Sequence, residues 1–300
     1  MGEKEVRIAV RAAGLNFPDL LMTKGGYQFR PDPPFVPGVE AAGDIVEIGP
    51  GVARFAVGDK VIAPVRMGAF AEQAVALEDA LFRLPPVFSY EEGACWFVSA
   101  TTAWHALNDK ADIQPGETLL VLGASGGVGM AAVQLGVHKG ARVIGLASSK
   151  AKAQAIRAAG AEAAFLNDQP DLIDAVKAAT GGKGVDVVYD PVGGPLATAA
   201  TRMIGWNGRY LVVGFASGEI PNFPANHALI KGYSIMGLRA GEAVRRDPAL
   251  GLRTHKALAD LAELGVMRPH ISHRVPLDEA GKVFAAMEER AIIGRAVILP

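Results

Sequence analysis

The chain has 300 residues, 50% of them hydrophobic, and 30 lysines and arginines offset 31 aspartates and glutamates to a net charge of −1. This length favours two domains, and the balanced charge gives no reason to expect a nucleic acid or an anionic membrane as a partner. A single cysteine, Cys95, excludes an internal disulfide bond and a four-cysteine zinc site. No apolar run approaches the roughly 18 residues that span a membrane, and the polar start is not a signal peptide, so we expect a cytoplasmic protein.

Short strands separated by tight turns are predicted for the first third of the chain. Gly49-Pro-Gly51 and Gly58-Asp-Lys60 favour turns between them. Short, regularly spaced strands of this kind are typical of a small β-barrel. The predicted strands are Val6–Val10, Ala42–Ile48, Lys60–Ala63 and Ala69–Val75.

From about Ser99 to Leu238 the pattern changes to alternating strands and helices. Six apolar strands with helical segments between them indicate an α/β fold of the Rossmann type, with a doubly wound parallel six-stranded sheet. The predicted strands are Leu119–Leu122, Val143–Leu146, Ala163–Leu166, Val185–Tyr189, Tyr210–Val213 and Ser234–Met236.

A glycine-rich run, Thr118-Leu-Leu-Val-Leu-Gly-Ala-Ser-Gly-Gly-Val-Gly129, leads from the first of these strands into a helix. Ala124, Gly126 and Gly129 have the spacing of the G-x-G-x-x-G fingerprint of dinucleotide binding. Ala124 stands in the tight turn, Gly126 lets backbone approach a pyrophosphate, and Gly129 lets helix and strand pack closely. We therefore expect a dinucleotide pyrophosphate at the start of this helix. The segment expected to contact it is Ala124, Ser125, Gly126, Gly127, Val128 and Gly129.

Two helices and a strand are predicted for the end of the chain. Asp247-Pro248, a cap followed by a first-turn proline, begins a helix that stops at Gly265. A second helix spans Asp278 to about Glu289, and a last strand spans Arg295–Leu299.

Other motifs accompany the glycine-rich run. They are Gly14-Leu-Asn-Phe-Pro-Asp19, Pro34-Phe-Val-Pro-Gly-Val-Glu-Ala-Ala-Gly43, Val57-Gly-Asp-Lys-Val61, Asp186-Val-Val-Tyr-Asp-Pro-Val-Gly193 and Gly208-Arg-Tyr-Leu-Val-Val-Gly-Phe-Ala-Ser217. Together the chain resembles the zinc-independent quinone oxidoreductase branch of the medium-chain dehydrogenase/reductase superfamily. The resemblance covers Val6 to Leu299.

This resemblance implies a GroES-like β-barrel catalytic domain that is interrupted by a Rossmann domain. It assigns residues 1–98 and 239–300 to the catalytic domain and residues 99–238 to the NADP-binding domain. Members of the family begin with about two further strands upstream of the Val6 strand, which this chain lacks. Two alternatives follow: either the start site is misplaced, or the barrel lacks a hairpin and has an unpaired strand edge.

The segment after the second Rossmann strand indicates NADPH rather than NADH. A carboxylate about 20 residues past the glycines would bind the ribose 2′-OH of NAD, and no Asp or Glu occurs from Gly123 through Ala161. Ser148, Ser149 and Lys152 instead offer hydroxyl and ammonium groups, and the resemblance matches Lys152 to the lysine that binds the 2′-phosphate. It also places Asn167 near the adenosine end, where relatives often carry a tyrosine.

Further cofactor contacts are expected at the carboxyl edge of the sheet, where cofactors lie in such folds. Val192, Gly214, Phe215 and Ala216 follow strands at this edge. The resemblance implies a nicotinamide contact for Thr102. It also implies that Gly294 and Arg295 reach back over the cofactor.

The resemblance places Asn16 and Val39 where zinc-dependent alcohol dehydrogenases hold a cysteine and a histidine ligand. Cys95 falls near a third ligand position with only Glu40 as a conceivable partner, so no metal is expected. Without a Lewis acid, hydride addition to a quinone or an activated C=C bond is easier than addition to a simple ketone. The resemblance matches Tyr27 to the family's active-site tyrosine, and Asn16 offers an amide N–H₂ near the nicotinamide.

These residues leave three functions open. The first is an NADPH-dependent reductase of a quinone or an α,β-unsaturated carbonyl compound. The second is a 2-enoyl-thioester reductase acting on CoA or carrier-protein substrates, and the third is a nonenzymatic NADPH-binding protein. We also expect a homodimer, because the last Rossmann strand, Tyr233 to Gly237, is apolar and should lie at the sheet edge.

Overall fold

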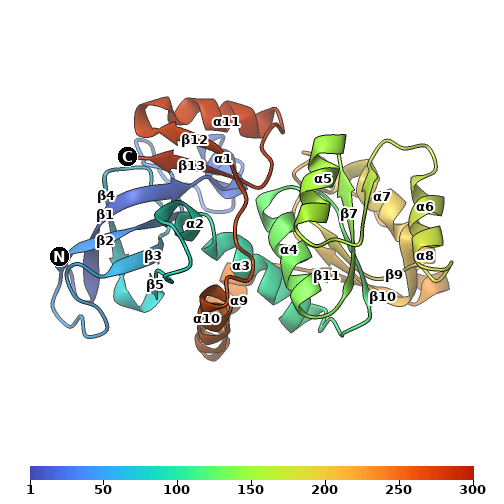
Figure 1. The fold of residues 1–300 in the computed structure, drawn as a ribbon, viewed down its shortest axis with the longest axis horizontal. Coiled ribbons are helices and arrows are strands. Elements are labelled where there is room, and N and C mark those ends of the chain that lie inside the picture. Colours follow the sequence, from blue (N-terminus) through green and yellow to red (C-terminus); the bar gives the residue numbers. More distant parts are fainter. The chain divides into compact units, whose positions relative to one another are not determined.

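The computed structural model describes residues 1–300, which form two compact units. Unit 1 contains Met1–Val98 and Ala262–Pro300, and unit 2 contains Ser99–Leu261 (Figure 1). The sequence motifs place the last division of the chain after Leu238, whereas the compact units divide after Leu261. No helix combines the length and the apolar character that crossing a membrane requires.

Unit 1 is built on a seven-stranded sheet with the order β12-β13-β1-β2-β3-β5, in which β4 also pairs with β1. The pairs are antiparallel except for the parallel pair of β12 and β13. The strands are β1 (Glu5–Gly14), β2 (Glu40–Ile48), β3 (Lys60–Pro64), β4 (Gln73–Leu77), β5 (Phe82–Arg83), β12 (Ile271–Pro276) and β13 (Arg295–Leu299). The helices are α1 (Phe17–Thr23), α2 (Tyr90–Ala94) and α11 (Ala280–Glu288), with short 3₁₀ turns at Glu78–Ala80 and Leu277–Glu279.

The first strand is the centre of this sheet. Side chains at alternate positions of β1, among them Val6 and Ile8, are fully buried and pack against Ile45 and Val61. β1 is paired with β2 along one side and with β4 and β13 along the other. The unpaired strand edge expected from the sequence therefore does not lie at β1.

Several strands of unit 1 differ from the sequence prediction. Strand β1 continues to Gly14 instead of ending at Val10, and β5 was not predicted. The predicted strand Ala69–Val75 begins only at Gln73, because the amides of Ala69 and Phe70 donate to the carbonyls of Gly38 and Pro37 and hold this segment in a loop. Strand β12 was not predicted. None of its side chains is fully buried, so it lacks the apolar alternation that marks a half-buried strand.

Unit 2 contains the predicted doubly wound sheet of six strands, all parallel, in the order β11-β10-β9-β6-β7-β8. The strands are β6 (Thr118–Val121), β7 (Arg142–Ala147), β8 (Ala163–Leu166), β9 (Val185–Asp190), β10 (Ile204–Val212) and β11 (Ser234–Gly237). The helices are α3 (Phe97–Trp104), α4 (Gly127–His138), α5 (Lys150–Ala158), α6 (Leu172–Ala179), α7 (Gly194–Met203), α8 (Ala225–Lys231), α9 (Ala240–Arg246) and α10 (Pro248–Glu263), and a π-helical segment spans His105–Lys110. Two of these helices, α3 and α10, cross the boundary between the units.

Helices cover both faces of the parallel sheet. Leu120 and Ile144 join a core cluster with side chains of α6 and α7 on one face. On the other face α4 lies close to Leu119 and Val143. A Cβ added to Gly136 of α4 would lie only 2.8 Å and 3.0 Å from these two side chains. Burial on both faces explains why the central strands are continuous apolar runs, which is the pattern that the sequence prediction used.

Candidate active site and cofactor site

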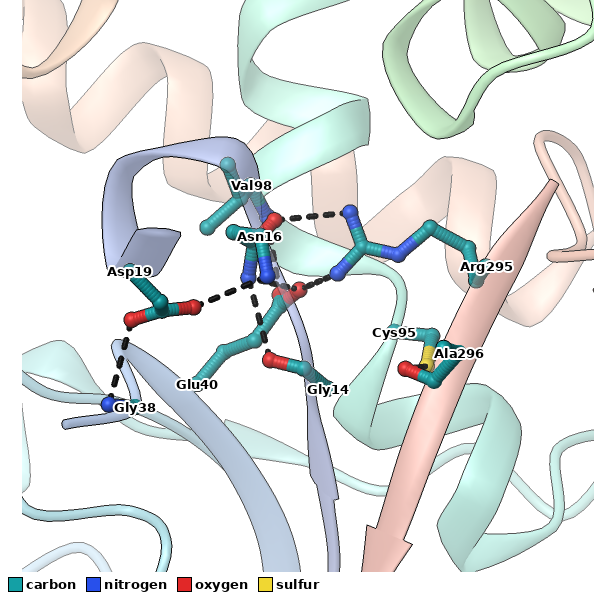
Figure 2. Close-up of polar contacts among 9 residues, drawn as sticks. All are labelled: Gly14, Asn16, Asp19, Gly38, Glu40, Cys95, Val98, Arg295 and Ala296. Carbon is teal, nitrogen blue, oxygen red and sulfur yellow. Dashed lines mark hydrogen bonds and ion pairs between the residues drawn. The ribbon is translucent and has the colours of Figure 1, made fainter. Parts of the chain in front are cut away.

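A buried polar cluster lies in unit 1 where β1, β2 and β13 meet. Asn16 follows β1, Glu40 begins β2 and Arg295 begins β13, and each is at most 5% exposed. The Asn16 amide donates to Glu40 Oε1 at 2.9 Å and to the Gly14 carbonyl at 3.2 Å, and its Oδ1 accepts from Arg295 at 2.7 Å (Figure 2). Arg295 also forms an ion pair with Glu40. Both amide hydrogens of Asn16 are therefore engaged within the chain.

The second oxygen of Glu40 is also occupied, since it accepts from the Val98 amide at 3.0 Å. Complete burial raises the pKa of the Glu40 carboxyl, and the Arg295 guanidinium opposes this shift. Three donors thus converge on one buried carboxylate, which holds the side chains of Asn16 and Arg295 in fixed positions.

Asp19 extends this cluster on α1. Its two carboxyl oxygens accept from the backbone amides of Asn16 at 2.8 Å and of Gly38 at 3.1 Å (Figure 2). Asp19 is fully buried, and burial raises the pKa of its carboxyl to about 7. The carboxyl ties the start of α1 to the loop that precedes β2.

Cys95 lies beside this cluster and is also fully buried. Its thiol donates to the Ala296 carbonyl at 3.7 Å, and burial raises its pKa to about 12. The thiol therefore stays protonated near neutral pH, which makes it a poor nucleophile.

Tyr27 lies on the other side of α1, in the loop between α1 and β2. It is partly exposed, and its carbonyl accepts from Arg30 Nε at 3.4 Å. No hydrogen bond within the chain engages the Tyr27 hydroxyl, so this donor is available to a ligand.

The predicted glycine turn lies in unit 2 between β6 and α4. Gly126 is the N-cap of α4, and a Cβ at Gly129 would lie 2.4 Å from the Gly123 carbonyl oxygen, so close packing requires glycine at position 129. A Cβ at Gly126 would meet only the same oxygen, at an ordinary 3.5 Å. The left-handed residue of the turn is Gly123, with φ +56°, and not the adjacent Ala124 that the fingerprint places there.

The residues predicted to bind a 2′-phosphate gather where β7 ends. Ser149 is the N-cap of α5 and accepts from the Lys152 amide, while the Lys152 ammonium donates to the Ser148 hydroxyl at 3.0 Å. Asn167 follows β8, and its backbone N–H donates to the Ala147 carbonyl at 2.8 Å. Its side-chain Oδ1 is buried and has no hydrogen-bond partner.

Two further loops meet at the carboxyl edge of the same sheet. The Gly214 amide donates to the Asp190 carbonyl and the Ala216 amide to the Pro191 carbonyl, so the segment Gly214–Ala216 adjoins the one with Val192. Phe215 is 37% exposed in this segment. The buried Asp190 carboxyl accepts from the Val192 amide at 2.8 Å and from the Tyr210 hydroxyl at 2.8 Å, and it fixes this arrangement.

Three other predicted cofactor residues stand on other elements of the chain. Thr102 is in α3 and partly buried. Gly294 has φ +71°, and a Cβ there would lie 2.0 Å from the His270 carbonyl. The Arg295 guanidinium is held by Glu40 and Asn16 within unit 1, as described above.

Sequence reasoning did not foresee the roles of Glu40, Arg295, Asp19 and Asp190 in positioning other residues. All four stand in or next to recognised motifs, but their partners are far apart in the chain: Arg295 contacts Glu40 across 255 positions. Local sequence patterns do not indicate such distant pairs, which become visible only in the contacts of a folded structure.

The fold and the site together define a two-unit protein of the dehydrogenase/reductase class. One unit offers a buried polar cluster with a neighbouring tyrosine, and the other offers a parallel sheet with a dinucleotide turn. The family model described as alcohol dehydrogenase GroES-like domain matches residues 2–86, and the model described as zinc-binding dehydrogenase matches residues 127–253.

Known proteins are similar over nearly the whole chain. The quinone oxidoreductase-like protein 2 homolog of Nematostella vectensis is 38% identical over 301 residues, covering 99% of this chain and 82% of that protein. The Escherichia coli quinone oxidoreductase complexed with NADPH is 28% identical with a TM-score of 0.89, covering 99% and 92%. The CurK enoyl reductase is 27% identical with a TM-score of 0.88, covering 99% and 91%. The chain belongs to the quinone oxidoreductase-like branch of the medium-chain dehydrogenase/reductase superfamily, a family of oxidoreductases.

The residues present do not fit the zinc ion that one of these descriptions names. The Arg295 guanidinium forms an ion pair with Glu40, and the Cys95 thiol contacts the Ala296 carbonyl at 3.7 Å. No group of three or more His, Cys, Asp or Glu side chains is placed to hold a metal ion.

Proposed function

We propose that this protein uses NADPH to reduce a quinone or an α,β-unsaturated carbonyl compound without a metal ion. The proposal rests on one observation above all. Where zinc-dependent relatives hold metal ligands, this chain has Asn16 held between Glu40 and Arg295, and the Tyr27 hydroxyl in the loop after α1 is a donor that no hydrogen bond within the chain engages. NADPH, when bound, supplies a hydride from C4 of its nicotinamide.

Two features of unit 2 support a bound dinucleotide. The chain's own packing does not require glycine at position 126, and a bare backbone there leaves room for a pyrophosphate at the start of α4. The unpartnered Asn167 Oδ1 offers a buried acceptor, which suits the amino group of an adenine.

Lys152 supports NADPH over NADH. Its ammonium group and the hydroxyl of Ser148 already lie together at the end of β7, so a 2′-phosphate would meet a positive charge and a hydroxyl donor. Ser149 caps α5 with its hydroxyl, so its part is to shape this end of the strand.

In the reaction, negative charge develops on the conjugated oxygen of the substrate as the hydride adds. We propose that the Tyr27 hydroxyl donates a hydrogen bond to this oxygen. Both amide hydrogens of Asn16 are engaged, so Asn16 forms a fixed wall of the site instead of a second donor.

The test is an NADPH-oxidation screen over quinones, enones and enoyl-CoA compounds with the wild type and Tyr27→Phe. Loss of one hydrogen bond to a developing negative charge should lower kcat/KM by about 10- to 100-fold and leave the Michaelis constant for NADPH unchanged. Tyr90→Phe, which removes a tyrosine hydroxyl elsewhere in unit 1, is the matched control and should retain full activity. Tight NADPH binding with no turnover of any compound would instead identify a nonenzymatic binding protein.

A second candidate function is 2-enoyl-thioester reduction, favoured by the similarity to the CurK enoyl reductase. Turnover of crotonyl-CoA without turnover of naphthoquinone would establish it. The opposite result would establish quinone reduction.

We further propose a homodimer formed through β11. This strand pairs only with β10, lies at the sheet edge as predicted, and exposes 43% of Ile235. The neighbouring helix α8 exposes 83% of Leu229. An apolar edge of this kind commonly pairs across a two-fold axis. Light scattering should show a dimer for the wild type and a monomer for Ile235→Lys.

A further inference from the structure

The loop that carries Tyr27 is joined to the segment between β3 and β4. Val65 donates its amide to the Val39 carbonyl at 2.9 Å, and Phe70 donates to the Pro37 carbonyl at 3.0 Å. Between these two anchors, the Arg66 guanidinium lies over the Phe29 ring at 3.9 Å from its centroid. Arg66 is therefore held against the loop of Tyr27, at Phe29, which is two residues after the tyrosine.

Stacking fixes a guanidinium without using its donors. The N–H groups of arginine lie in the plane of the group, so contact through its face leaves them directed outward as a planar fork. Arg30, one residue past Phe29, uses its Nε for a 3.4 Å contact to the Tyr27 carbonyl, which leaves its two terminal nitrogens. One arginine thus contacts the Tyr27 backbone, and the other stacks on the ring two residues further along the same loop.

These two arginines differ from most others of unit 1. Arg7, Arg11, Arg83, Arg268, Arg274 and Arg295 each form an ion pair with a carboxylate. No carboxylate oxygen lies within 4.0 Å of the Arg30 or Arg66 guanidinium, although Asp32 is close in sequence. The neighbouring Lys24, by contrast, is neutralised by Glu288 at 2.7 Å. The guanidinium groups of Arg30 and Arg66 therefore form no ion pair within the chain.

We propose that Arg30 and Arg66 bind an anionic group of the substrate while its conjugated carbonyl lies at Tyr27. The inference rests on the proposed function and deepens it, because it names the substrate class: conjugated carbonyl compounds that carry a phosphate, sulfonate or carboxylate. Arginine forks bind such groups through paired N–H···O contacts. The anion could belong to the phosphorylated carrier of a thioester or to an acidic quinone.

Two matched substrate pairs test this proposal. One pair is crotonyl-CoA and crotonyl-N-acetylcysteamine, and the other is 1,2-naphthoquinone-4-sulfonate and 1,2-naphthoquinone. The anionic compounds are crotonyl-CoA and 1,2-naphthoquinone-4-sulfonate. Arg30→Gln and Arg66→Gln should each lower kcat/KM for one of these two by about 10-fold or more, and should leave kcat/KM for its neutral counterpart unchanged. Arg274→Gln, which removes an exposed arginine of unit 1, should change neither. The affected pair identifies the source of the anion. Equal losses on both members of each pair would overturn the proposal.

A binding measurement separates this proposal from the proposed function. Butyryl-CoA and naphthalene-1-sulfonate carry the anions without a reducible bond, so calorimetry with NADP-loaded protein reads the site without turnover. At least one of them should bind to the wild type and bind at least 10-fold more weakly to the double variant. If one of these anions binds to the wild type and more weakly to the double variant, but no compound is reduced, the proposed reaction fails and the anion site stands. If neither binds, or the double variant binds equally well, the anion site fails whatever the activity.

Discussion

Replacing Glu40 by Gln should destabilise unit 1 far more than its small change in shape suggests. The Asn16 amide and the Arg295 guanidinium donate to one oxygen of Glu40, and the Val98 amide donates to the other. A glutamine has one acceptor oxygen and one N–H₂ group, so in either orientation a donor faces a donor. The substitution also leaves the Arg295 charge buried without its counter-ion.

The size of the effect follows from that burial. Removing one partner of a buried ion pair costs about 3–5 kcal/mol, because the remaining charge cannot be solvated. The pair of Arg7 and Glu47 is also an arginine–glutamate ion pair, but its side chains are 41% and 50% exposed. Glu47→Gln should therefore cost less than about 1 kcal/mol. Both substitutions remove one carboxylate from an arginine, but only Glu40 is buried and accepts further hydrogen bonds from Asn16 and Val98.

Urea unfolding followed by tryptophan fluorescence measures both. Trp96 is 1% exposed in unit 1, so a background of Trp104→Phe and Trp206→Phe makes it the reporter of this unit. A free-energy loss for Glu40→Gln below about 1 kcal/mol, or equal to that of Glu47→Gln, would refute the reasoning. The double variant Glu40→Met with Arg295→Met should lose less than the sum of its single variants, since it leaves no unpaired charge.

Three further outcomes are expected. Lys152→Ala should raise the Michaelis constant for NADPH about 10-fold or more and leave that for NADH unchanged; equal effects would remove the 2′-phosphate assignment. Gly129→Ala should lower the melting temperature, because its Cβ would meet backbone at 2.4 Å, whereas Gly126→Ala should leave it unchanged and weaken NADPH binding in calorimetry. The pKa of Asp19, about 7 against about 3.9 in an unfolded chain, means that its contribution to stability is full below pH 4 and is lost as pH rises through 7. Between pH 5 and 8 the wild type should lose roughly 2–3 kcal/mol relative to Asp19→Asn in urea unfolding, and a constant difference would contradict this.

The parallel sheet could be predicted from the sequence because its strands are buried on both faces. Such strands are apolar runs ended by glycine or polar turns, and the predicted strand Leu119–Leu122 overlaps β6, whose four residues are all buried. Strand β10 begins six residues earlier than predicted, at Ile204 instead of Tyr210. Its first half contains Trp206 and Asn207, which are exposed and therefore give no apolar signal.

The site was less accessible to sequence reasoning. The positions of Asn16 and Tyr27 came from the family resemblance, and their surroundings depend on long-range contacts that local patterns do not encode. The contact of Arg295 with Asn16 spans 279 positions. Periodicity places each residue on a strand or a turn, but it does not pair the end of one strand with the start of another. Glu40 therefore stood in the sequence only as a conceivable partner of Cys95.

Stability alone does not explain why a buried Glu40–Arg295 pair occupies this position. A well-packed apolar pair of similar volume is often as stable as a buried ion pair or more so. Both members of the pair contact the Asn16 side chain: Glu40 accepts from its N–H₂ group, and Arg295 donates to its Oδ1. Asp19 then fixes the backbone of Asn16 and the loop before β2. The arrangement gives the site a rigid polar wall without a metal ion. The variant with methionine at both positions should therefore keep its fold and lose activity, since it removes the restraint on Asn16 while leaving no unpaired charge.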